Sequence, residues 1–136
     1  MSIKKIASTG LLSLSLTGIP FLAHAELRIN NHSNSDSTAV INNGTCSSSA
    51  LGAAGITEAH STNTVSDFII WYTCRSSPHD CRADVYMTRD CYASGASKVA
   101  SVVFDTQIGI KSIDNFSDKY LISGSGFSID LSDISY

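Results

Sequence analysis

The first 25 residues of the chain have the layout of a secretory signal peptide, so the fold must be built from residues 26–136 outside the cytoplasm. Two lysines, at positions 4 and 5, begin the segment, and an uncharged, largely apolar stretch runs from Ile6 to Leu22. Ala23-His24-Ala25 then places small residues where signal peptidase cleaves. Serine, threonine, glycine and proline interrupt the apolar stretch, which argues against a membrane anchor. We therefore expect cleavage after Ala25 and no membrane span in the mature protein.

All four cysteines of the chain, Cys46, Cys74, Cys81 and Cys91, lie in the predicted mature part. An even number of cysteines behind a signal peptide predicts two disulfides, because the destination compartment is oxidising. A zinc site is the alternative, but the chain has no Cys-x-x-Cys pair of the kind that such sites use. We expect neither a bound metal nor a thiol nucleophile.

The spacing of the cysteines favours one of the three possible pairings. If residues 82–88 form one straight strand, Cys81 and Cys91 lie more than about 20 Å apart. A disulfide requires Cα atoms within about 7 Å of each other. Cys74 and Cys81 flank a turn, so the favoured pairs are Cys74–Cys81 and Cys46–Cys91. A bulge or bend in the strand would leave the other pairings open.

The mature chain has short strand-like segments along nearly its whole length, separated by turn residues, and this pattern is typical of an all-β domain. We expect a single domain, residues 26–136, that forms an antiparallel β-sandwich or a small barrel of about seven strands, stapled by two disulfides. The expected strands lie around Leu27–Ile29, Thr38–Ile41, Phe68–Tyr72, Ala83–Thr88, Val99–Phe104, Ile108–Ile110, Tyr120–Ile122 and Phe127–Leu131.

Two segments carry specific expectations. Phe68–Tyr72 is a continuous apolar and aromatic run, as in a central strand covered on both faces, so Trp71 is expected mainly in the core. The Cys46–Ser66 segment is small and polar, and it predicts a long loop with room for one helical turn.

The mature part is acidic and lacks the common motifs of cofactor chemistry. It contains seven basic and twelve acidic residues, which gives a net charge of −5. An acidic domain with scattered bases offers little to nucleic-acid phosphates, so nucleic acid is not an expected partner. The sequence has no G-x-S-x-G, H-E-x-x-H, P-loop or G-x-G-x-x-G motif, and no cofactor is expected.

Aromatic residues near the predicted cysteine-linked hairpin suggest a binding surface. Trp71, Tyr72, Tyr86 and Tyr92 gather there in the sequence, and strand alternation places Asp84 on the same face as Tyr86. An exposed ring beside a carboxylate is a pattern that binds sugars, because the ring covers C–H groups while the polar neighbour bonds hydroxyls. Tyr86 is the better exposed candidate.

We therefore expect a monomeric binding module whose partner is a glycan or a host or envelope protein. The contact surface would combine the Tyr86 face with the Cys46–Ser66 loop, which carries His60.

Two alternatives to a binding module remain open from the sequence. A small secreted hydrolase could use His60 or His79 with an aspartate such as Asp67, although serine is so frequent that a Ser-His-Asp match carries little information. A surface assembly could use the alternating segment Phe127–Leu131 as an edge strand lent to another subunit. Ordinary closure of the chain's own sheet is the favoured reading of that segment.

Three segments of the chain resemble a group of small secreted proteins of gammaproteobacteria. They are Asn42-Asn43-Gly44-Thr45-Cys46, Cys81-Arg82-Ala83-Asp84-Val85-Tyr86-Met87-Thr88 and Gly109-Ile110-Lys111-Ser112. The resemblance spans most of the mature chain and implies a bacterial source with export to the periplasm or beyond. The group has no assigned activity, so the resemblance assigns no catalytic residue.

Overall fold

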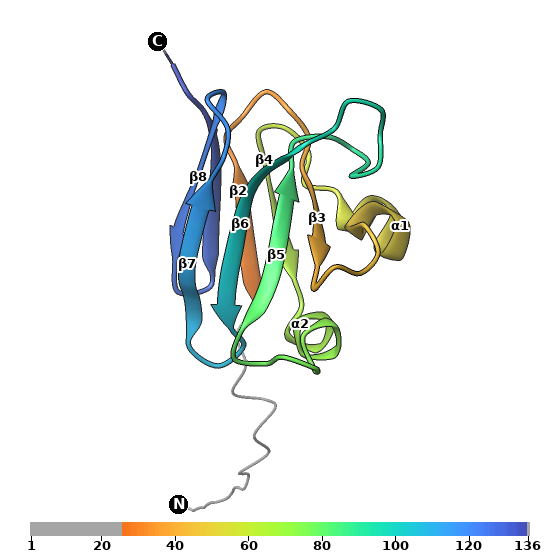
Figure 1. Ribbon diagram of the computed structural model, residues 1–136, viewed down its shortest axis with the longest axis vertical. Coiled ribbons are helices and arrows are strands. Elements are labelled where there is room, and N and C mark those ends of the chain that lie inside the picture. The colour runs from red at the N-terminus through yellow and green to blue at the C-terminus, as the bar shows by residue number, and fades with distance from the viewer. Residues whose placement is uncertain (1–25, 136) are drawn as a thin grey trace, which may run out of the picture.

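Two four-stranded β-sheets pack face to face in the computed structural model, which describes residues 26–135 (Figure 1). The predicted signal peptide lies outside the described residues. The first sheet has the order β4 (Ser61–Val65), β2 (Leu27–Asn31), β9 (Ser128–Asp133), β8 (Tyr120–Ser125). The second has the order β3 (Thr38–Ile41), β5 (Cys81–Tyr86), β6 (Lys98–Asp105), β7 (Gly109–Asn115). The expected all-β sandwich is confirmed.

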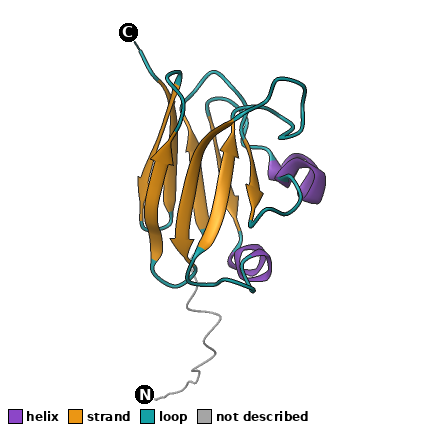
Figure 2. Cartoon of the chain, viewed as in Figure 1, coloured by secondary structure: helices purple, strands orange, loops and turns teal. Residues whose placement is uncertain are grey.

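Three short helical segments accompany the sheets. They are α1 (Ser47–Leu51), the 3₁₀ turn η3 (Gly52–Gly55) and α2 (Asp67–Thr73). Both α-helices lie beside the sandwich, on the side of β3 and β5 (Figure 2). Within residues 26–135, no helix is long and apolar enough to cross a membrane.

The first and last described strands pair in parallel at the centre of the first sheet. Ile29 of β2 lies opposite Ile129 of β9, and every other strand pair is antiparallel. β9 therefore lies between β2 and β8, with a hydrogen-bonded neighbour on each side. Phe127–Leu131 thus closes the chain's own sheet, as the sequence favoured, and the alternative of an edge strand lent to another subunit is excluded for β9, because both of its edges are paired.

The hydrophobic core fills the space between the two sheets. Alternating residues of each strand point inward, as the period-2 pattern predicts. The first sheet contributes Leu27, Ile122, Ile129 and Leu131, and the second contributes Ala83, Val85, Val102 and Phe104. A smaller cluster of Val40, Cys46 and Cys91 packs on the far side of β3, against Tyr86.

The apolar run Phe68–Tyr72 forms part of helix α2, not the central strand expected from the sequence. Ser66 begins the helix, since its side chain accepts a hydrogen bond from the backbone N–H of Ile69. Ile70 is the buried residue of this helix. A short apolar run cannot be assigned to strand or helix by periodicity, and here the capping residue that precedes the run decides the outcome.

The Cys46–Ser66 segment contains more regular structure than the expected loop. It forms α1 and η3 and ends in β4, which pairs with β2 along five residues from Leu27↔Val65 to Asn31↔Ser61. The β4 sequence, Ser-Thr-Asn-Thr-Val, has no apolar alternation, so the pattern did not reveal this strand.

The Asn115 side chain and a backbone hydrogen bond join the two sheets along one side. The Asn115 amide donates to the carbonyl of Ile122 and accepts from its N–H, both at 2.9 Å. The N–H of Ile110 also donates to the carbonyl of Gly126 at 2.8 Å. These contacts link β7 to β8 and to the turn that follows β8, so the sandwich is partly closed on this side, as in a small barrel.

The structure contains the two disulfides that strand length favoured. Cys46–Cys91 ties the start of α1 to the loop after β5, and its Cα atoms lie 5.7 Å apart. Cys74–Cys81 ties the end of α2 to the first residue of β5, with Cα atoms 5.5 Å apart. All four cysteines are buried.

The two disulfides are expected to contribute unequally to stability. They close loops with sequence separations of 45 and 7 residues. In the loop-entropy model, alanine at both Cys46 and Cys91 lowers the free energy of unfolding by about 4 kcal/mol, and alanine at both Cys74 and Cys81 by about 2 kcal/mol. Equilibrium urea unfolding of the two double variants measures the difference. If the variant without Cys74 and Cys81 loses more free energy of unfolding than the other variant, loop length does not determine the contribution of each disulfide.

Candidate functional site

The most unusual surface feature is a group of exposed aromatic side chains on α2. Phe68 is 65 % exposed, Trp71 45 % and Tyr72 52 %. Arg75 follows directly after the helix, with its guanidinium carbon 4.0 Å from the centre of the Tyr72 ring. We call these four residues the α2 aromatic cluster.

The rings of the α2 aromatic cluster contact one another and form a joint surface. The centres of Phe68 and Trp71 lie 6.0 Å apart, and those of Phe68 and Tyr72 lie 6.4 Å apart with an interplanar angle of 22°. Arg75 also donates a hydrogen bond to the backbone carbonyl of Tyr72, which holds the guanidinium over the ring. The contacts follow from spacings of three and four residues, which place side chains on one helical face.

The helix that carries the cluster is held firmly against the sandwich. Ile70 and Cys74 belong to the core, and the disulfide to Cys81 anchors the end of the helix to β5. The Asn42 side chain donates to the carbonyl of Thr73 at 3.3 Å. The aromatic residues are thus presented outward from an element whose opposite face is fixed.

The cluster differs from the other exposed large apolar residues of the described chain. Those residues lie on separate elements: Leu51, Tyr92, Ile108, Phe116 and Leu121. Single exposed apolar side chains are ordinary, whereas adjacent ones mark interaction sites.

The expectation that Trp71 is mainly a core residue is wrong. A strand would have covered both faces of the Phe68–Tyr72 run, but the helix buries Ile70 and leaves Trp71 almost half exposed. Phe68 and Arg75 were missed as site residues. The available signal was Ser66-Asp67, a capping residue followed by an acid in the first turn, which is typical of a helix start.

The four aromatic residues expected to gather around one hairpin divide between two places. Trp71 and Tyr72 lie on α2, near Cys74–Cys81. Tyr86 is partly buried and packs near the other disulfide. Tyr92 is exposed, and its hydroxyl donates to the carbonyl of Gly44 at 3.1 Å. The structure therefore does not join Tyr86 and Trp71 in one surface.

Asp84 is buried, which corrects its expected role beside an exposed Tyr86. One carboxylate oxygen accepts a hydrogen bond from the Ser101 hydroxyl at 2.7 Å. The same oxygen lies 3.3 Å from Nε of Arg82 and 3.7 Å from Nζ of Lys98. These side chains cover the carboxylate on the outer face of the second sheet.

The two histidines of the hydrolase alternative lie in different settings. Nε2 of His60 lies 2.7 Å from Oδ1 of Asn34, and His60 lines a groove of about 440 Å³ together with His32. Nδ1 of His79 lies 2.9 Å from Oδ2 of Asp105. The aspartate partner of His79 is thus Asp105, and His60 is bonded to an asparagine.

The His79–Asp105 pair joins two turns of the fold. Asp105 is buried and accepts hydrogen bonds from the backbone N–H groups of Gln107 and Ile108, at 2.7 and 3.3 Å. Within residues 26–135, no hydroxyl or thiol is hydrogen-bonded to the His79 ring, and no three His, Cys, Asp or Glu side chains are grouped to hold a metal ion. The pair connects the turn before β5 to the turn after β6.

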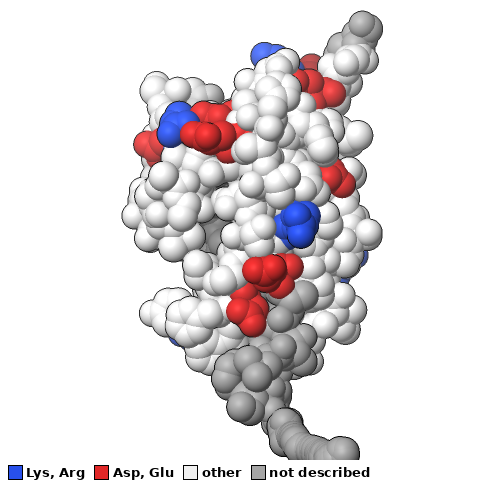
Figure 3. Space-filling view, turned by 180° about the vertical axis from the view of Figure 1, so that it is seen from behind, with Lys and Arg blue, Asp and Glu red and all other residues white. Residues whose placement is uncertain are grey.

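Charged side chains are sparse on the surface. Seen from behind, lysine, arginine, aspartate and glutamate form small separate groups on a mostly uncharged face (Figure 3). One of the ion pairs joins Arg89 to Asp36 at 2.8 Å. The Arg89 guanidinium bonded to Asp36 lowers the pKa of that carboxyl.

The exposure of Trp71 can be measured directly, because it is the chain's one tryptophan. We expect red-shifted emission and efficient quenching by acrylamide, since almost half of the residue is exposed. Steady-state fluorescence of the native protein and of the protein in denaturant gives the comparison. Blue-shifted emission with little quenching in the native state would contradict the exposed position.

Asp105 is expected to make stability depend on acid pH. Its pKa is lowered chiefly by the hydrogen bond from Gln107 and further by His79, while burial acts in the opposite direction. A carboxyl with a lowered folded-state pKa stabilises the fold above its unfolded pKa of about 3.9, and this contribution is lost as the pH falls toward the folded value.

We therefore expect Asp105→Asn to lower Tm at pH 7 and to approach the wild-type Tm below about pH 4. Thermal unfolding across this range measures the difference, and Asp114→Asn, at an exposed position on β7, controls for the loss of one charge. A difference in Tm that stays constant with pH would contradict the assignment.

Comparisons with known proteins place the chain in a family. The family model of the T2SS substrate NttC matches residues 2–135. The crystal structure of the Legionella pneumophila type II secretion system substrate NttC is similar with a TM-score of 0.64 and 21 % sequence identity, over 81 % of this chain and 98 % of that chain. None of the curated proteins matches the chain.

The structural similarity, at this sequence identity, supports the shared fold. The match to the family model agrees with the resemblance to small secreted gammaproteobacterial proteins and makes it specific. The chain belongs to the NttC family of type II secretion substrates.

Proposed function

We propose that this exported protein is a recognition module that binds another protein through the α2 aromatic cluster. The observation that carries the proposal is the exposure of three adjacent aromatic side chains on a helix fixed to the sandwich. Export follows from membership of the family of type II secretion substrates. A partner of the protein would therefore be met in the periplasm or outside the cell.

The composition of the cluster favours a protein partner. Tryptophan, tyrosine and arginine dominate the binding energy of protein interfaces, and Trp71, Tyr72 and Arg75 lie together here. Small-ligand and sugar sites are usually concave. The three rings are 45–65 % exposed, so no deep wall surrounds them.

The attachment of α2 lowers the entropic cost of binding. The inward side of the helix is fixed by Ile70 and by the Cys74–Cys81 disulfide. A side chain that is already ordered loses less freedom when a partner covers it. Aromatic side chains add large contact area with few rotatable bonds.

A site-specific photocrosslinker tests the proposal. We would place p-benzoylphenylalanine at Tyr72 and, as a matched control, at Ile108, another exposed apolar position. Periplasm, envelope and intact host cells are then irradiated with each protein. We expect a discrete protein adduct from position 72, which excess wild-type protein suppresses and the triple variant F68S/W71S/Y72S does not.

The same experiment separates the other outcomes. Equal adducts from positions 72 and 108 would contradict a specific interface on α2. If the wild-type protein binds a glycan array and the triple variant does not, the partner is a glycan and the proposal of a protein partner is wrong. Circular dichroism and the secreted amount of each variant measure whether folding and export are intact.

A further inference from the structure

Among the sheet edges of residues 26–135, the outer edge of β4 is the one that the chain leaves open. The outer edge of β3 is covered by α1, and the N–H of Ala39 donates to the Ser47 hydroxyl there at 3.0 Å. The edge strands β7 and β8 are joined to each other by the two hydrogen bonds between Asn115 and Ile122. β4 is an edge strand with β2 on one side and no strand on the other.

The register of β4 on β2 identifies the backbone groups that point outward. The N–H of Arg28 donates to the residue just before β9, so the backbone groups of the next residue, Ile29, face β4. Ile29 lies opposite Asn63, which therefore bonds to β2. The N–H and C=O groups of its neighbours Thr62 and Thr64 point away from the sheet.

These outward groups have no partner in the part of the chain that the structure describes. No hydrogen bond within residues 26–135 joins the backbone N–H or C=O of Thr62 or Thr64 to another residue, and both threonines are exposed. The Asn63 side chain donates to the carbonyl of Ala54 at 3.0 Å. That contact involves a side chain and leaves the backbone edge of β4 free.

β4 lacks the features that keep edge strands from pairing. Its sequence, Ser-Thr-Asn-Thr-Val, contains no charge and no proline, and its five-residue ladder with β2 has no bulge. Lysine, proline and bulges are the usual means by which proteins protect such an edge. Threonine and valine also favour the extended conformation. An unpaired row of N–H and C=O groups on a strand of this kind is a template for one more strand.

We propose that β4 accepts an extended segment of the partner protein as a fifth strand of the first sheet; this rests on the proposed function and names the form of its partner. The backbone of the segment pairs with Thr62 and Thr64. Helix α2 begins two residues after Val65, so the segment continues past the end of β4 toward the α2 aromatic cluster. A segment with alternating apolar and polar residues fits, because alternate side chains lie beside Val65 and beside the solvent-facing threonines.

A second copy of the chain fits this edge less well than a free segment. α1 and α2 lie on the side of the sandwich where β3 and β4 form the sheet edges (Figure 1). Antiparallel pairing of two β4 strands would place both second sheets on the same side of the joined sheet. The helices of the two copies would then meet in one space, whereas a single extended segment brings no such elements.

A phage-displayed library of random dodecapeptides supplies the probe. The library is panned on the exported protein, and a recovered peptide is synthesised and added to isotope-labelled protein. Hydrogen exchange followed by nuclear magnetic resonance is the measurement. We expect the amides of Thr62 and Thr64 to exchange rapidly in the free protein and roughly tenfold more slowly with the peptide bound.

Two variants at one position test the backbone pairing. Thr64→Pro removes an N–H that β2 does not use, so it is expected to lower peptide affinity roughly tenfold. Thr64→Ala keeps the N–H, and its affinity is expected to stay within about twofold of the wild type. If circular dichroism shows that Thr64→Pro does not fold, the variant T62K/T64K replaces it, because edge lysines block strand addition.

Several results would overturn strand addition at β4. These are a library that yields no binding peptide, peptides that bind without slowing exchange at Thr62 and Thr64, and equal affinities of Thr64→Pro and Thr64→Ala. Exchange at the two threonines that slows with protein concentration alone would identify a second copy as the occupant and would also contradict the proposal.

The variant F68S/W71S/Y72S separates this inference from the proposed function. Peptide binding that this variant loses, with no slowed exchange at Thr62 and Thr64 in the wild type, would retain the α2 aromatic cluster as the site and reject strand addition. Slowed exchange with an affinity that the triple variant leaves unchanged would support strand addition and contradict the contribution of α2.

Discussion

The parallel pairing of β2 with β9 holds the first sheet together. It joins residues about a hundred positions apart, such as Ile29 and Ile129, and both outer strands of the sheet attach through this central pair. The pair also contributes Leu27 and Leu131 to the core. Such distant contacts carry a large loop-closure cost, and the burial of apolar side chains between the sheets offsets it.

Helix α2 is attached to the sandwich by a small number of contacts. The core contains Ile70 and the Cys74–Cys81 bond, and the Asn42 side chain donates to the carbonyl of Thr73. The remaining aromatic side chains add nothing to the core, so their exposure costs the fold solvation free energy. Adjacent exposed aromatic side chains of this kind are typical of surfaces that bind another molecule.

The sequence predicted those parts of the fold that rest on alternation and spacing. β5 and β9 alternate cleanly, and the cysteine spacing favoured the two bonds that the structure contains. Prediction from the sequence failed where tertiary packing determines the structure. The apolar pattern of Phe68–Tyr72 fits a strand or a helix equally well, and the polar strand β4 has no apolar alternation. Asp84 was placed on the correct strand face, but covering side chains determine its burial.

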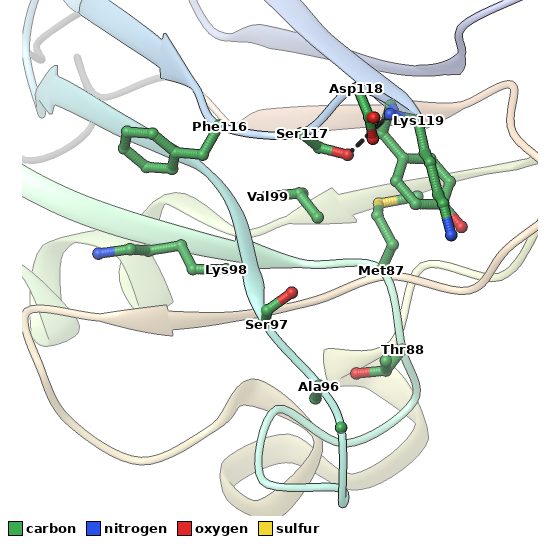
Figure 4. A pocket seen from close by; sticks show the side chains of 12 residues that line it. Met87, Thr88, Ala96, Ser97, Lys98, Val99, Phe116, Ser117, Asp118 and Lys119 are labelled. Atoms are coloured by element: carbon green, nitrogen blue, oxygen red, sulfur yellow. Dashed lines mark hydrogen bonds between the residues drawn. The ribbon is translucent and has the colours of Figure 1, made fainter.

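The α2 aromatic cluster is separated by the length of β5 from a surface groove lined by residues 95–99 and 116–120 (Figure 4). Cys81, the first residue of β5, is bonded to the end of α2, whereas Met87 follows its last residue and lines the groove. Six residues of strand span about 20 Å. A partner bound at the α2 aromatic cluster, as proposed above, would therefore leave this groove uncovered. Any coupling between the two places would have to pass through β5 and its neighbours in the core.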